Sequence, residues 1–204
     1  MGLFKNFGKP EGLTGKLLLS GMNLSHTALS RWALEHVDLE PNDRVLDVGC
    51  GGGKNLRRML RLCPRGQVDG IDISVECVRK SLQSCGTNRN CEVLLASVEQ
   101  IPYPEDSFDT VTSFESHYFF PCMESSLREI LRVLRPGGTF MTACCYSDPE
   151  CIWGHLVKDM RICTPAKLEE YLIQAGFTDI RVDTSHRAWA CVTGKKPSRK
   201  AAAA

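Results

Sequence analysis

Short apolar runs alternate with amphipathic segments between residues 45 and 144, and this alternation restricts the possible fold more than any other feature. The runs have the length of buried strands and occupy residues 45–48, 68–73, 93–96, 110–114 and 139–144. The helix-like segments between them carry apolar side chains at intervals of three and four and occupy residues 55–62, 75–82 and 125–134. The pattern predicts a doubly wound, Rossmann-like α/β sheet that is mostly parallel, with helices on both faces.

The chain after residue 134 departs from this regular alternation. Pro136 prevents further helix, and the glycines after it permit positive φ before the next strand. A last helix is predicted from Pro165 to just before Gly176. The following segments, 177–182 and 189–193, alternate like half-exposed strands, and their short connection predicts an antiparallel hairpin at the sheet edge.

The length of 204 residues suits a single domain. We expect this domain to span 1–194, with a helical lid over about residues 1–40, and we expect 195–204 to be a disordered tail or a cloning remnant. Lys and Arg number 25 against 24 Asp and Glu, so the net charge of +1 gives no broad field for nucleic acid. The start lacks the apolar run of a signal peptide, and no run is long enough for stable membrane insertion, so the expected location is the cytoplasm. Nothing in the sequence indicates an oligomeric state.

The 11 cysteines do not have the pattern of a disulfide framework. Their number is odd, they are scattered, and none stands at the C-x-x-C spacing of zinc or redox sites. This distribution predicts free thiols and no metal site.

A glycine-rich loop follows the first apolar run, where α/β sheets bind their ligands. Two nucleotide-binding motifs can be tested by counting. A P-loop ending at Lys54 would need glycine where Val48 stands. A G-x-G-x-x-G motif would need its third glycine at Lys54 or Leu56, which weakens the dinucleotide interpretation.

The remaining pattern is Asp-x-Gly-x-Gly at 47–51, with Asp72 ending the next apolar run. Together with the blocks at 70–74, 101–109 and 134–138, it resembles the class I S-adenosylmethionine-dependent methyltransferases, in particular the branch related to ubiquinone and menaquinone methyltransferases. The resemblance covers about residues 44–142 and implies a Rossmann-like fold with S-adenosylmethionine as cofactor.

The resemblance also implies a set of cofactor-binding residues, which are Asp47, Gly49, Cys50, Gly51, Asp72, Ile73, Ser97, Val98 and Phe114. The loop at 49–51 would lie beside the methionine end, supported by Asp47. Asp72 would accept hydrogen bonds from both ribose hydroxyls, although it could instead cap the helix that begins near Ser74. Ser97 stands where the family commonly has Asp.

The acceptor side is expected just after the fourth run. Glu115 or His117 could act as a general base there, and the aromatic residues at 118–120 could line an apolar pocket. An equally open alternative makes the aromatics core residues and His117 a loop-orienting residue. Asn23 and His26, in the expected lid, could touch cofactor or acceptor, or could belong to an ordinary helix start.

The residues leave three functions open. The first is methyl transfer from S-adenosylmethionine to an unidentified small-molecule acceptor. The second is a nucleotide-dependent oxidoreductase, which the missing third glycine disfavours. The third is a protein that binds S-adenosylmethionine without turnover.

Overall fold

A computed structural model of the chain describes residues 27–145, 148, 157, 159–185 and 189–198. Seven strands form one sheet in the order β3-β2-β1-β4-β5-β7-β6. The strands are β1 (Arg44–Val48), β2 (Gln67–Asp72), β3 (Val93–Leu95), β4 (Phe108–Phe114), β5 (Leu134–Cys144), β6 (Thr178–Asp183) and β7 (Ala190–Lys195). The first five run parallel, while β7 is antiparallel to both β5 and β6. The predicted α/β fold with an antiparallel edge hairpin is therefore confirmed.

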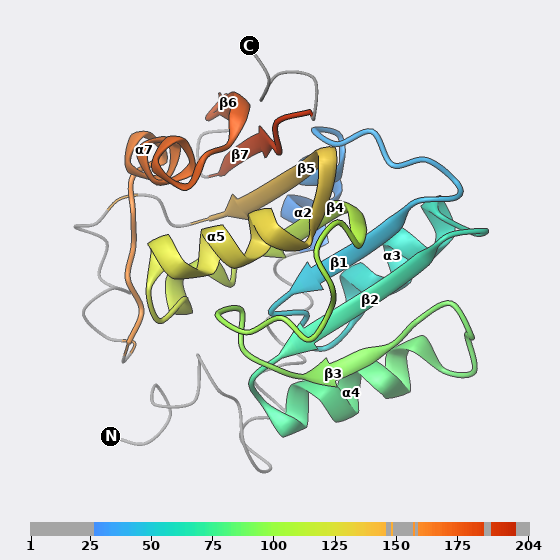
Figure 1. Ribbon diagram of the computed structural model, residues 1–204. Coiled ribbons are helices and arrows are strands. Elements are labelled where there is room, and N and C mark those ends of the chain that lie inside the picture. Colours follow the sequence, from blue (N-terminus) through green and yellow to red (C-terminus); the bar gives the residue numbers. More distant parts are fainter. Residues whose placement is uncertain (1–26, 146–147, 149–156, 158, 186–188, 199–204) are drawn as a thin grey trace.

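Helices cover both faces of the sheet (Figure 1). They are α2 (Thr27–Leu34), α3 (Lys54–Leu62), α4 (Val75–Cys85), α5 (Met123–Val133) and α7 (Pro165–Ala175), with a short 3₁₀ helix, η2 (His117–Phe119). Helices α2 and α3 pack in one apolar cluster, while α5 and α7 pack in the other. None of the described helices is long and apolar enough to cross a membrane.

The central strand β1 shows how the sequence builds the two layers. Val45 packs into the cluster that contains α3, whereas Leu46 and Val48 pack into the cluster that contains α5. All three side chains are buried, because successive strand residues point to opposite faces and both faces are covered by helices. Apolar side chains are therefore required on both faces of this strand, and Asp47, which stands between them, is buried as well.

The segment after α5 differs from the expected turn. Strand β5 already begins at Leu134, which pairs with Phe108, and regular pairing resumes between Thr139 and Thr110. The intervening residues form an irregularity within the strand, where Gly137 has a φ of +83° and donates its N–H to the Lys196 carbonyl. Glycine is suited to this place because it adopts positive φ without strain.

Two further expectations need correction. Lys195 closes β7, and the Lys196 ammonium donates to Asp106 and to two carbonyls, so these residues belong to the fold and not to a tail beginning at 195.

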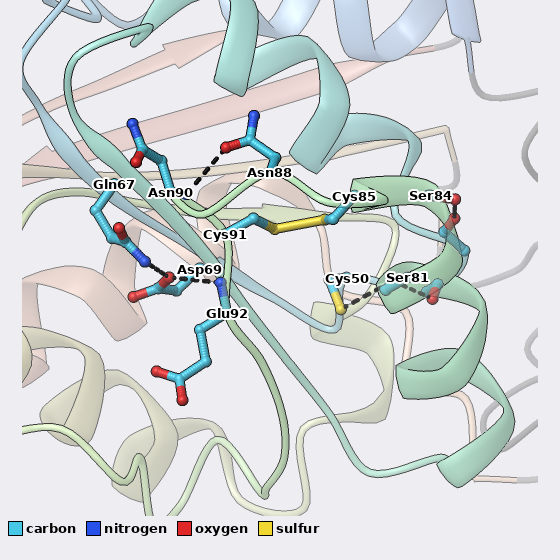
Figure 2. The surroundings of a disulfide bond; sticks show 12 residues. Cys50, Gln67, Asp69, Ser81, Ser84, Cys85, Asn88, Asn90, Cys91 and Glu92 are labelled. Carbon is cyan, nitrogen blue, oxygen red and sulfur yellow. Dashed lines mark hydrogen bonds between the residues drawn. A yellow bond between two sulfur atoms is a disulfide. The ribbon is translucent and has the colours of Figure 1, made fainter.

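The free-thiol prediction is wrong for Cys85 and Cys91, which form a disulfide across the loop between α4 and β3 (Figure 2). The scattered positions of the cysteines along the chain gave no hint of this local pair.

Candidate functional site

The glycine loop leaves β1 at the carboxyl edge of the sheet and leads into α3. Gly49, Gly51 and Gly53 all have positive φ. A Cβ on Gly49 would lie 2.5 Å from the Ser116 Cβ, so a side chain is excluded there. A Cβ on Gly51 would meet no atom within 4 Å. The loop therefore packs tightly against Ser116 at Gly49 and faces open space at Gly51.

Asp72 ends β2 beside this loop. Its Oδ2 accepts the Gly51 N–H at 2.9 Å and its Oδ1 accepts the Ser74 N–H at 2.9 Å. Burial raises the pKa of the Asp72 carboxyl, and the backbone N–H groups partly oppose that rise. The N-cap of α4 is Ser74, whose Oγ accepts the Cys77 N–H, so Asp72 contacts the start of this helix without being its cap residue.

Asp47 lies beneath the loop in the sheet core. It is buried, and the Thr112 hydroxyl donates to it at 2.8 Å. Burial raises the pKa of Asp47 to about 7, with the hydrogen bond from Thr112 acting against the rise and nearby Asp72 adding to it. Asp47 can therefore support the loop from below but does not line the cavity.

A cavity opens over the loop, and most of the predicted cofactor residues line it. The predicted residues that do so are Gly49, Cys50, Gly51, Asp72, Ile73, Ser97, Val98, Phe114 and Glu115. Ile73 leaves 44% of its surface exposed, as expected for an apolar side chain that a ligand would cover. The Ser97 hydroxyl accepts the Glu99 N–H at 3.2 Å. Asn23 and His26 lie outside the described residues.

Glu115 stands at the cavity wall where β4 ends. It has a φ of +56°, an uncommon conformation for a residue with a side chain. The Cys145 N–H donates to its carboxyl, and Tyr118 also hydrogen-bonds to it. Burial is the largest influence and raises the pKa of Glu115 to about 7. A carboxyl with this pKa can exchange a proton near neutrality.

His117 lies in η2 and is not brought into the cavity. The residue is 1% exposed, and its Nδ1 is 3.0 Å from the Thr142 hydroxyl. Its Nε2 has no hydrogen-bond partner among the described residues. Burial lowers the pKa of His117 to about 4, so the ring is neutral near pH 7. The alternative in which His117 orients its loop fits this placement better than the general-base hypothesis.

One wall of the cavity was not predicted from the sequence. Lys54, Asn55 and Arg58 line it from α3, and Ser30 lines it from α2. Ser116 also lines the cavity, and its hydroxyl donates to the Val48 carbonyl at 2.7 Å. The position of 54–58 directly after the glycine loop was the available signal, since the first turns of that helix must face the ligand edge.

The lining fits S-adenosylmethionine. Asp72 provides carboxylate oxygens, which accept hydrogen bonds as ribose hydroxyls require. Ile73 and Val98 offer apolar surface for an adenine ring, and the space beside Gly51 accommodates a ligand where a side chain would intrude. Within the described ranges, no group of three His, Cys, Asp or Glu side chains is placed to hold a metal ion.

Comparison with known proteins gives an independent result. The family model described as "Methyltransferase domain" matches residues 46–142. The chain is 33% identical over 143 residues to a ubiquinone/menaquinone biosynthesis C-methyltransferase UbiE of Pseudomonas savastanoi pv. phaseolicola, an alignment that covers 68% of this chain and 55% of the relative. It is also 33% identical over 113 residues to 24-methylenesterol C-methyltransferase 2 of Arabidopsis thaliana, covering 54% of this chain and 31% of that protein. The chain thus spans about half the length, or less, of these curated relatives.

Solved structures share the fold. The putative methyltransferase solved in complex with the Haloferax volcanii Trm112 methyltransferase activator superposes with a TM-score of 0.77 at 25% identity, covering 88% of this chain and 94% of that structure's chain. A SAM-dependent methyltransferase from Aquifex aeolicus gives a TM-score of 0.77 at 21% identity, with 88% and 97% coverage. Because the Aquifex aeolicus protein is only 21% identical, this match supports the fold alone.

Proposed function

Because the chain belongs to the class I S-adenosylmethionine-dependent methyltransferases, we propose that it transfers the methyl group of this cofactor to a small-molecule acceptor. The cofactor supplies an electrophilic methyl group on a sulfonium. The names of two relatives, which specify ubiquinone/menaquinone biosynthesis and 24-methylenesterol, support an acceptor with apolar character. The aromatic side chains of Phe119 and Phe120 in the cavity wall also support an apolar acceptor.

The observation that carries this proposal is the junction of Asp72 with the Gly51 loop at the cavity. The hydrogen bond between them joins the ends of two adjacent parallel strands. One carboxylate thereby holds the loop and still presents oxygen atoms toward the ribose position. We assign the cofactor to 49–51, Asp72, Ile73, Ser97 and Val98.

We propose that Glu115 is the general base, which takes a proton from the acceptor when methyl transfer requires the acceptor to lose one. Glu115 lines the cavity, and the Cys145 N–H and Tyr118 hold its carboxyl in place. Its pKa of about 7 allows it to accept a proton near neutral pH. Phe114, one residue earlier, would form the wall beside the transferred methyl group.

The test uses the full chain and cofactor carrying a labelled methyl group. The protein is incubated with this cofactor and a fractionated small-molecule extract, and transfer of label and formation of S-adenosylhomocysteine are measured. Gly51→Arg, which fills the space beside the loop, is the inactive control. Cofactor binding without transfer to any fraction would favour the non-catalytic protein, and binding of NAD in its place would favour the oxidoreductase.

A further inference from the structure

Helix α4 holds the carbonyl groups of the glycine loop. The Ser81 hydroxyl donates to the Gly51 carbonyl at 2.9 Å, and the Ser84 hydroxyl donates to the Gly52 carbonyl at 2.7 Å. Gly51 and Gly52 both line the cavity. Since Asp72 accepts the Gly51 N–H, the backbone of Gly51 is held at both of its polar groups.

The loop and α4 are also packed closely against each other. A Cβ on Gly53 would lie 2.8 Å from the Ser81 Cα, so the two backbones approach without room for a side chain. The Cys50 Sγ lies 3.5 Å from the Ser81 Oγ, and Ser81 is fully buried. The loop can therefore keep its hydrogen bonds only while the C-terminal half of α4 stays in place.

A disulfide fixes this end of α4. The helix ends at Cys85, directly after Ser84 and one turn after Ser81, and Cys85 is bonded to Cys91 (Figure 2). Without the bond, the end of α4 would be joined to the sheet edge only through residues 86–90, which are exposed or half-buried. A segment with so little burial restrains a helix end weakly.

Cys91 is in turn anchored to the sheet by its two neighbours. The Val68 N–H donates to the Asn90 carbonyl at 2.9 Å, and the Gly70 N–H donates to the Glu92 carbonyl at 2.8 Å. Both donors belong to β2, which lies beside β1, the strand from which the glycine loop departs. The disulfide thus ties the last turn of α4 to the part of the sheet that carries the loop.

The position of the disulfide makes it accessible to a reductant. Cys85 and Cys91 are both half-buried, and residues 86–89 between them are exposed. Burial raises the pKa of the free thiols of Cys50 and Cys77, that of Cys77 to about 12, so both stay protonated near neutral pH. Because the thiolate is the form that exchanges with a disulfide, these two buried thiols do not compete readily for the bond.

Resting on the proposed function, we propose that Ser81 and Ser84 position the cofactor loop and that the disulfide at the end of α4 is a redox switch for this positioning. In the oxidised form the helix end is fixed and both loop carbonyls are held. A dithiol reductant opens the bond, because its thiolate attacks one cysteine sulfur and its second thiol resolves the mixed disulfide. Two electrons and two protons pass to the protein, which gains two thiols, while the reductant becomes a disulfide. The reduced form, with the end of α4 released, binds the cofactor more weakly.

The experiment measures cofactor affinity of the full chain in both redox states. Dissociation constants of labelled S-adenosylmethionine are determined by equilibrium dialysis in reduced or oxidised dithiothreitol, and alkylation followed by mass spectrometry reports the state of Cys85 and Cys91. We expect reduction to raise the dissociation constant of wild type about 3- to 30-fold, as for the loss of one or two hydrogen bonds between neutral groups, and reoxidation to restore it.

Variants separate the proposed route from a general effect of reduction. The double variant Ser81→Ala/Ser84→Ala should bind weakly in both redox states, because the contacts through which the disulfide acts are gone. Gln83→Ala removes an exposed polar side chain from the same turn and should keep the affinity and the redox response of wild type. Since Ser81 is fully buried, Ser84→Ala is also measured alone and should show a smaller response.

Cys85→Ser/Cys91→Ser distinguishes this disulfide from the other thiols. It should bind the cofactor like reduced wild type and should not respond to dithiothreitol. Thermal unfolding establishes that each protein is folded at the assay temperature.

The switch is overturned if reduction leaves the affinity of wild type unchanged, or if the double serine variant responds as strongly as wild type. It is also overturned if both thiols stay free under oxidising conditions, or if the reduced protein unfolds, since the disulfide would then act on the whole fold. Failure of wild type to bind S-adenosylmethionine in either redox state would instead contradict the proposed function itself.

Discussion

The Asp72 carboxylate accepts the Gly51 backbone N–H at 2.9 Å, so the end of β2 fixes the glycine loop that follows β1. The two strands are neighbours in parallel register, with Val48 opposite Ile71. The same carboxylate accepts the Ser74 N–H and so also fixes the start of α4. The geometry of the loop and, in our proposal, the contact with the ribose thus depend on one side chain.

Replacement of Asp72 by alanine should weaken S-adenosylmethionine binding by roughly 10- to 1000-fold, because the ribose loses charge-assisted hydrogen bonds and the loop loses its anchor. Calorimetric titration measures the effect. Ser74→Ala is the matched control. It removes the side-chain cap of α4 and should lower the free energy of unfolding by about 1 kcal/mol with little change in cofactor affinity. If both variants lost the same amount of affinity for S-adenosylmethionine, the role of Asp72 would be limited to holding the start of α4.

Gly51→Arg should abolish cofactor binding while the protein stays folded. Gly86→Arg is the matched control, because Gly51 and Gly86 have φ of +55° and +62° and neither would place a Cβ within 4 Å of another atom. Both variants place a side chain at a positive φ, and Gly86, with a ψ of −131°, lies outside the left-handed region, so the stability of each variant is measured by itself. Gly86 lies beyond the end of α4 and does not line the cavity, so its variant should bind the cofactor normally. Thermal unfolding and calorimetry check the two expectations separately, and a cofactor-binding Gly51→Arg would remove the loop from the site.

The fold was largely predictable from the sequence because buried parallel strands need apolar side chains on both faces, as Val45, Leu46 and Val48 illustrate. The cofactor side was predictable in part, since strand ends such as Asp72 meet at one sheet edge wherever the strands are parallel. The resemblance to a known family supplied the individual roles.

The acceptor side was not predictable from sequence spacing. Glu115 and His117 are two residues apart, but the chain turns into η2 between them, which directs His117 into the core while Glu115 stays at the cavity. The place of Arg58 in the cavity wall was missed because it depends on what lies beside the residue in space. Its partner Asn55 and its cationic neighbours belong to a pattern that looks like an ordinary solvated helix face.

The placement of His117 predicts an effect on stability and not on cofactor binding. Its pKa is about 4 in the fold against 6.5 for an ordinary histidine, so between these values the unfolded chain binds a proton that the folded chain does not. Stability is therefore lost as pH falls from about 6.5 to 4, by up to ~3 kcal/mol from this residue. Across this range, His117→Gln should lose less unfolding free energy than wild type in denaturant titrations. Parallel curves for the two proteins would contradict the burial argument.

Glu115 gives the prediction on catalysis. Its pKa is about 7, so the fraction in the carboxylate form, and with it the rate, should rise as pH increases through neutrality. Glu115→Gln keeps the size of the side chain but cannot take a proton, and it should lower kcat by about 10²- to 10⁴-fold and remove this rise.

The raised pKa gives Glu115 a second, separable effect. Its protonated form is favoured in the fold, so its contribution to stability is present below pH 4.5 and is lost as pH rises through about 7, opposite to the trend expected for activity. The prediction on catalysis is tested by measuring S-adenosylhomocysteine production across a pH range of about 5 to 9, once an acceptor is identified. Cofactor affinity is measured alongside and should change little in Glu115→Gln. Glu124→Gln serves as the control, because Glu124 lies in the first turn of α5 and does not line the cavity. If Glu115→Gln and wild type showed the same rate and the same pH profile, alignment of cofactor and acceptor would have to account for catalysis without a base.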